Sequence, residues 1–155
     1  MATTNENTAR AFTDLVAINH TGAKGYQEAA EGVTNPQLKS ELSKLSQQRA
    51  EFASQLSQHA TRLGVTSDSG TVESALTEAA AAVHRGWINL KSAVTDQSDV
   101  AILGECETGD ATALTAYEMA LKADLPADAK AVIEQQHSQI LSAKNKITEL
   151  KGQVK

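Results

Sequence analysis

The chain has 155 residues, of which 41% are hydrophobic and only 3% aromatic, and its formal net charge is -5. This length suits one domain, 1–155, with a core built largely from Ala, Leu, Val and Ile. The 14 Lys and Arg residues are scattered among 19 acidic ones, so we expect no nucleic-acid partner. No apolar stretch approaches the roughly 20 residues that span a bilayer, so we expect no membrane partner either.

The compartment follows from the cysteine count and the start of the chain. The single cysteine, Cys106, excludes an internal disulfide. The polar start MATTNENTAR lacks the basic and then apolar layout of a secretory signal. We therefore expect a cytoplasmic protein, in which residues 1–7 either fray or extend the first helix.

Two helices are predicted before residue 64. Apolar residues recur at intervals of three and four from about Thr8 to Val33, and again from Asn35 to Gly64. This is the spacing of one buried helix face. Asn35 can cap the second helix, and Pro36 is tolerated in its first turn because the amide that proline lacks has no helical partner there. The short connection makes the two helices an antiparallel hairpin.

Three further helices are predicted after a loop at 64–70. The first runs from Val72 to Val94 and carries Trp87 on its apolar face. The next begins after a polar break at 95–99 and ends before Pro126, whose ring disfavours helical geometry at the preceding residue. The last begins at Pro126 and shows isoleucine at successive steps of seven, at Ile133, Ile140 and Ile147. No strand pattern occurs, so the fold class is all-α.

The order of these helices predicts a ferritin-like four-helix bundle. Two hairpins are joined by a longer segment that contains its own helix, as in bundles with one long crossover. Projection of each helix at about 100° per residue turns several polar side chains toward the core. The core polar cluster consists of Arg49, Asp110, Gln136 and His137, with Glu107 at its edge and Asn19, His59 and Lys144 in similar positions.

Two kinds of chemistry fit this cluster, because a buried charge needs a partner. Arg49 and Asp110 could form a bidentate ion pair, since guanidinium stays protonated and matches the two carboxylate oxygens. The alternative is a site for iron, manganese or zinc. Its candidate ligands are Glu107, Asp110, Glu134 and His137. We favour the ion pair, because a guanidinium repels a metal ion unless carboxylates outnumber it.

Several stretches together resemble a known family. They are GAKGYQEAAEGVTNPQLK, QQRAEFASQL, HRGWINLKSAV, ECETGDATALTAYEMAL and DLPADAKAVIEQQHSQI. The chain is similar to the small bacterial ferritin-like four-helix-bundle proteins catalogued under a domain of unknown function. The resemblance implies this fold and an association with stress physiology, and no established activity.

Ferritin-like proteins that bind two metal ions offer a comparison. They use a Glu from each of two helices and a Glu-x-x-His pair from each of the other two. This chain has one such pair, Glu134 and His137, whereas Ser54 stands three residues after Glu51 and Asn19 takes the inward position on the first helix. We therefore expect a non-catalytic bundle that acts through its surface, as a possible homodimer, with a metal-binding redox or storage protein as the alternative.

One surface group also stands out. His84 and Arg85 flank Trp87. Packing of the crossover is the favoured interpretation of this group, and a patch for a binding partner is the alternative.

Overall fold

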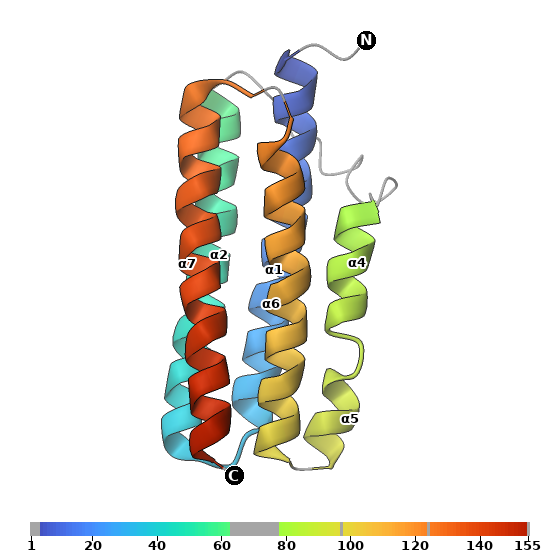
Figure 1. The fold of residues 1–155 in the computed structure, drawn as a ribbon, viewed down its shortest axis with the longest axis vertical. Coiled ribbons are helices and arrows are strands. Elements are labelled where there is room, and N and C mark those ends of the chain that lie inside the picture. The colour runs from blue at the N-terminus through green and yellow to red at the C-terminus, as the bar shows by residue number, and fades with distance from the viewer. Residues whose placement is uncertain (1–3, 63–77, 97, 124, 155) are drawn as a thin grey trace.

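The computed structural model describes residues 4–62, 78–96, 98–123 and 125–154. Within these ranges the chain forms helices joined by short connections, and no strand, which confirms the all-α prediction. The helices are α1 (Thr4–Gly32), α2 (Pro36–Arg62), α4 (Glu78–Gly86), α5 (Leu90–Thr95), α6 (Asp99–Leu121) and α7 (Ala127–Gln153). Residues 4–7 extend the first helix. Figure 1 shows the long helices α1, α2, α6 and α7 side by side along the longest axis.

Two side chains, the amide of Asn35 and the carboxylate of Asp99, accept hydrogen bonds from the connection between α1 and α2 and from the start of α2. Asn35 caps α2 as predicted, and its Oδ1 accepts hydrogen bonds from the backbone N–H groups of Gln37 at 2.8 Å and Leu38 at 3.2 Å. Asp99, the first residue of α6, accepts hydrogen bonds from the backbone N–H and the hydroxyl of Thr34 at 2.9 and 3.0 Å. The start of α6 is thereby tied to the α1–α2 turn.

The second hairpin consists of α6 and α7. Ser98 caps α6 by accepting a hydrogen bond from the N–H of Ala101 at 3.1 Å. Pro126, with φ -59° and ψ 154°, directly precedes α7, so this helix begins one residue later than predicted. Both hairpins are antiparallel (Figure 1).

The crossover unit comprises α4, α5 and the turn at 87–89 between them. Its structure differs from the single helix that the sequence predicts. The sequence predicts one helix from Val72 to Val94, whereas the structure has two short ones over its described part. In the turn, the N–H of Trp87 donates to the carbonyl of His84, three residues back, at 3.2 Å. Such tight bonds end an α-helix. The predicted start at 72–77 lies outside the described residues.

Gly86 gives the physical reason for the break. Glycine weakens a helix, and Gly86 is the last residue of α4. A Cβ atom at this position would lie 2.7 Å from Oγ1 of Thr112 on α6. The close approach of α4 to α6 therefore requires a residue that also favours the end of a helix.

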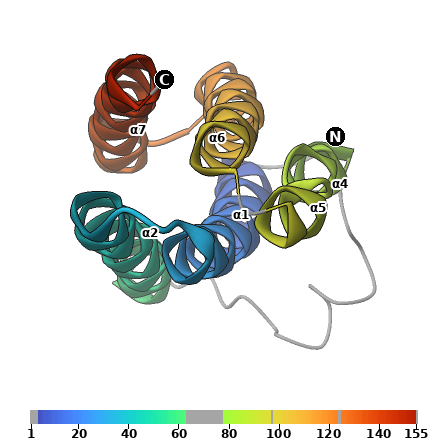
Figure 2. The ribbon, with the colours of Figure 1, turned by 90° about the horizontal axis from the view of Figure 1, so that it is seen from below.

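The core lies among the long helices and under the crossover unit. The end-on view in Figure 2 places α4 and α5 against α1 and α6, on the side away from α2 and α7. Side chains that are 0–2% exposed come from every long helix; they include Phe12, Leu15, Ile18, Leu42, Leu56, Ile102, Leu103, Ile133, Ile140 and Ile147. In the described part of the chain, no helix is both long enough and apolar enough to cross a membrane.

Candidate functional site

The charged cluster lies in the middle of the core and consists of Arg49 on α2, Asp110 on α6 and Tyr26 on α1. All three side chains are at most 1% exposed. Nη2 of Arg49 lies 3.0 Å from Oδ1 of Asp110, and the hydroxyl of Tyr26 donates a hydrogen bond to Oδ2 of the same carboxylate. The guanidinium carbon lies 5.5 Å from the centre of the Tyr26 ring, within the range of a cation–π contact. Three helices thus meet at one carboxylate.

The ion pair differs in detail from the bidentate fork that the sequence suggests. Tyr26 uses one oxygen of Asp110, which leaves the other for Arg49. Nε and Nη2 of Arg49 and Oδ1 of Asp110 have no well-aligned hydrogen bond among the described residues. The contact between the two side chains is therefore mainly one of charge.

Glycines on α1 and α6 bring large side chains close to this cluster. Gly22 faces the stem of Arg49. Trp87 of the crossover unit lies in a socket between Gly25 and Gly109, where an added Cβ atom would lie 2.6 and 2.2 Å from the indole ring. The indole packs edge to face on Tyr26, with ring centres 5.2 Å apart and planes at 69°. The crossover unit therefore covers the charged cluster directly.

The amide chain is a second polar network, and it crosses all four long helices. Asn19 on α1 donates to the hydroxyl of Tyr117 on α6 at 2.7 Å, and this hydroxyl donates to Oε1 of Gln136 on α7 at 2.7 Å. Nε2 of Gln136 then donates to Oε1 of Gln55 on α2 at 3.1 Å. The three hydrogen bonds all run in one direction, from Asn19 toward Gln55, because each group donates to the next. Hydrogen bonds arranged in this way strengthen one another.

Burial dominates the electrostatics of the core. It raises the pKa of Asp110, against the opposing effects of Arg49 and of the Tyr26 hydroxyl. Burial, together with the negative charge of Asp110, also raises the pKa of Tyr26 and of Cys106. A raised pKa keeps the Cys106 thiol protonated, so this residue lacks the thiolate that a nucleophile needs.

Tyr117 makes the alkaline limit of stability testable. Burial raises its pKa from 10.0 to about 12, although the hydrogen bond from Asn19 opposes the shift. Because the folded state holds the phenolic proton more tightly than the unfolded state, this contribution is complete below about pH 10 and is lost as pH rises toward 12. A shift of this size corresponds to about 3 kcal/mol of unfolding free energy. We expect tyrosinate absorbance to appear together with loss of the helical circular dichroism signal.

The control for this titration is Tyr117→Phe, which removes one of the two tyrosines. Its folded state should lose less stability between pH 10 and 12 than wild type does. Tyrosinate formation near pH 10 in a protein that remains fully helical would contradict the assignment.

The predicted metal ligands are not brought together. The structure corrects the predicted position of His137. The sequence predicts an inward side chain, whereas the observed side chain is 23% exposed and its Nε2 lies 3.1 Å from Oε2 of Glu118. Gln136 occupies the buried position between Ile133 and Ile140 on α7. The next residue, His137, therefore lies at the border between the buried and the exposed face of this helix. Glu134 is exposed on the same helix.

The remaining candidates also lie apart from the charged cluster. Glu107 accepts hydrogen bonds from Lys151 and Thr148 on α7, and these lower its pKa overall although partial burial raises it. Lys144 and His59 are half-buried. Across the described residues, no three His, Cys, Asp or Glu side chains gather in a way that could hold a metal ion.

The residues that sequence reasoning missed are the two tyrosines and Gln55. Tyr26 and Tyr117 count as apolar positions in a helical projection, yet each hydroxyl is central to a network. The available signal was that a buried tyrosine hydroxyl usually finds a partner. Gln55 is exposed, and nothing in the sequence pattern indicates that it accepts a hydrogen bond from the buried Gln136.

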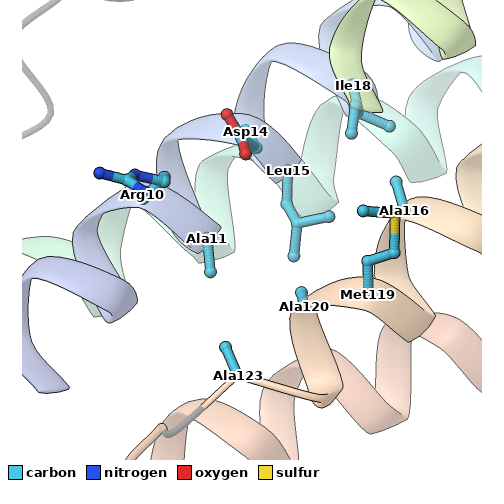
Figure 3. Close-up of a pocket in the computed structure, with 9 residues that line it drawn as sticks. All are labelled: Arg10, Ala11, Asp14, Leu15, Ile18, Ala116, Met119, Ala120 and Ala123. Carbon is cyan, nitrogen blue, oxygen red and sulfur yellow. The ribbon is translucent and has the colours of Figure 1, made fainter. Parts of the chain in front are cut away.

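A partly apolar surface groove lies away from both networks. It has a volume of about 240 Å³ and runs between the first half of α1 and the end of α6 (Figure 3). It is lined by Arg10, Ala11, Asp14, Leu15, Ile18, Ala116, Met119, Ala120 and Ala123. None of these residues belongs to the charged cluster or to the amide chain.

Comparison with known proteins gives one result. A search of curated proteins found no match to the chain. A family model described as "Domain of unknown function (DUF2383)" matches residues 7–123, which extend from α1 past the end of α6 and include Arg49, Tyr26 and Asp110. This match covers well over half of the sequence. The chain therefore belongs to the family defined by this domain of unknown function, DUF2383.

Proposed function

We propose that this chain is a non-catalytic, cytoplasmic, stress-associated protein of the bacterial ferritin-like type, a four-helix bundle that acts through its surface. In this proposal the charged cluster replaces a metal centre in the core. The order of the helices supports the fold: the α1–α2 and α6–α7 hairpins are joined by a crossover that contains α4 and α5.

The observation that carries the proposal is the position of Arg49. Its guanidinium is 1% exposed and lies 3.0 Å from Asp110, the one candidate ligand that is fully buried. A fixed positive charge at this distance repels a cation from the same carboxylate. The other candidates, Glu107, Glu134 and His137, face a lysine, solvent and Glu118 respectively. The residues present therefore do not fit a di-metal centre.

The amide chain supports a structural role for the core. A hydrogen-bonded series through Asn19, Tyr117, Gln136 and Gln55 is complete only when α1, α6, α7 and α2 have one particular rotation and height. Polar groups of this kind can fix helix register, because any other register leaves them unpaired in the core. A stable scaffold of this kind leaves function to the outer surface.

Elemental analysis of the protein purified from its native source tests the proposal. We expect iron, manganese and zinc each to remain far below one equivalent per chain, and a chelator to leave the melting temperature unchanged. Near-stoichiometric metal would overturn the proposal, provided that His137→Ala releases it while His20→Ala, at an exposed histidine on α1, does not.

A further inference from the structure

The outer side of the crossover unit differs from the rest of the molecule in its charge. From Ala79 to Thr95 the sequence has no acidic residue, although it contains His84, Arg85 and Lys91, and the whole chain has a net charge of -5. Arg85 and Lys91 therefore give this segment a net positive charge, and the acidic residues Glu78, at the start of α4, and Asp96, just after α5, border it. This segregation of charge suggests a surface for recognition.

The packing of the crossover unit decides which side chains face outward. Val83, Trp87, Leu90 and Ala93 are buried against α1 and α6. Their spacing is that of one helix face, so the side chains next to them in sequence lie on the other face. The outer face, as we define it, consists of His84, Arg85, Ile88 and Lys91, all of which are exposed.

Ile88 gives the outer face an apolar centre. Its side chain is 63% exposed, more than the other large exposed apolar side chains of the described residues, Met119 and Leu141. The turn at 87–89 produces this exposure, because it docks Trp87 inward and leaves the next residue outside. A single exposed isoleucine is common, but here a cation lies on each side of it in the sequence.

The cations of the outer face have no acidic partner within the described residues. Among all the described residues, the cations that form ion pairs are Lys44, Arg49, His137, Lys146 and Lys151. Arg85 and Lys91 take part in none of them. Their side chains can therefore bind an external carboxylate without breaking an ion pair between described residues.

We propose that the outer face binds an acidic polypeptide segment that carries one apolar side chain. The apolar side chain packs on Ile88, and flanking carboxylates pair with Arg85 and Lys91. This inference rests on the proposed function, because it supplies the partner through which a non-catalytic bundle acts. Charge favours a short acidic segment over a membrane or a nucleic acid, since a chain with a net charge of -5 is repelled by extended anionic surfaces.

A blocked, glutamate-rich peptide with one central leucine is the probe. Titration into the intact protein at low salt should change the fluorescence of Trp87, the only tryptophan, which is next to Ile88. We expect Arg85→Glu with Lys91→Glu to weaken binding at least about tenfold, because two attractive contacts become repulsive. Ile88→Ser should weaken it less, and should remove the preference for the leucine peptide over one with serine in its place.

Matched variants on other surfaces serve as controls. Lys122→Glu with Lys130→Glu changes the net charge by the same amount, and Leu141→Ser removes an exposed apolar side chain from α7. Both should bind the peptide with affinities close to that of wild type. Of the side chains changed in these variants, Lys130 is half-buried and the others are exposed, so unaltered melting temperatures check that the fold is intact.

Four results would overturn the inference. They are absence of peptide binding, equal weakening by the control variants, preferential binding to anionic phospholipid vesicles, and self-association that Ile88→Ser abolishes. None of these results would restore a metal centre, so failure here is distinct from failure of the proposed function.

Discussion

Replacing Asp110 by alanine is expected to destabilise the protein by about 3–5 kcal/mol, because it leaves the guanidinium of Arg49 buried without a counter-charge. Arg49 is 1% exposed, and its ion pair with Asp110 joins α2 to α6. The variant also removes the acceptor of the Tyr26 hydroxyl. Urea denaturation followed by circular dichroism measures the loss.

A double-mutant cycle separates the charge effect from general loss of packing. Arg49→Met with Asp110→Leu replaces both charges by apolar side chains, and we expect it to cost about 2 kcal/mol less than the sum of the single changes. Asp96→Ala removes an exposed carboxylate and should change stability by less than about 0.5 kcal/mol. Additive losses in the cycle would show that the two side chains are not coupled.

Replacing Trp87 by alanine is expected to cost about 3–5 kcal/mol, because it empties the socket between Gly25 and Gly109. The indole is 8% exposed and contacts the ring of Tyr26, so the loss affects both the crossover unit and the charged cluster. The free energy of unfolding in urea is again the measurement.

The neighbouring residue provides a control for Trp87. Ile88→Ala changes a side chain that is 63% exposed, and we expect an effect within about 0.5 kcal/mol. A loss below about 1 kcal/mol for Trp87→Ala would show that the crossover unit is not docked through this residue.

Much of the fold follows from local patterns in the sequence. The spacing of apolar residues locates the long helices, and Asn35 marks the start of α2 through a cap that the structure contains. Projection of α2 and α6 places Arg49 and Asp110 inward, where the structure has them. These predictions succeed because side-chain direction along a regular helix depends only on the helical repeat.

The remaining features depend on contacts between helices, which a single helix does not encode. On α7, His137 and Gln136 lie on neighbouring directions, and packing against α6 and α2 decides that the glutamine is the buried one. The break between α4 and α5 depends similarly on the approach of Gly86 to Thr112 on another helix. A helical projection also gives no height along the axis, so it could not show that Glu107 pairs with Lys151.

The glycine socket has a consequence for the order in which the chain folds. Its two walls, Gly25 on α1 and Gly109 on α6, belong to different hairpins and are far apart in the sequence. Helices that are neighbours in sequence have small loop-closure entropy, so the α1–α2 and α6–α7 hairpins can form early. The tryptophan has no complete binding surface until the hairpins have met. Although the crossover unit lies in the middle of the sequence and next to α6, we therefore expect Trp87 to complete its contacts with both walls only after the two hairpins have met.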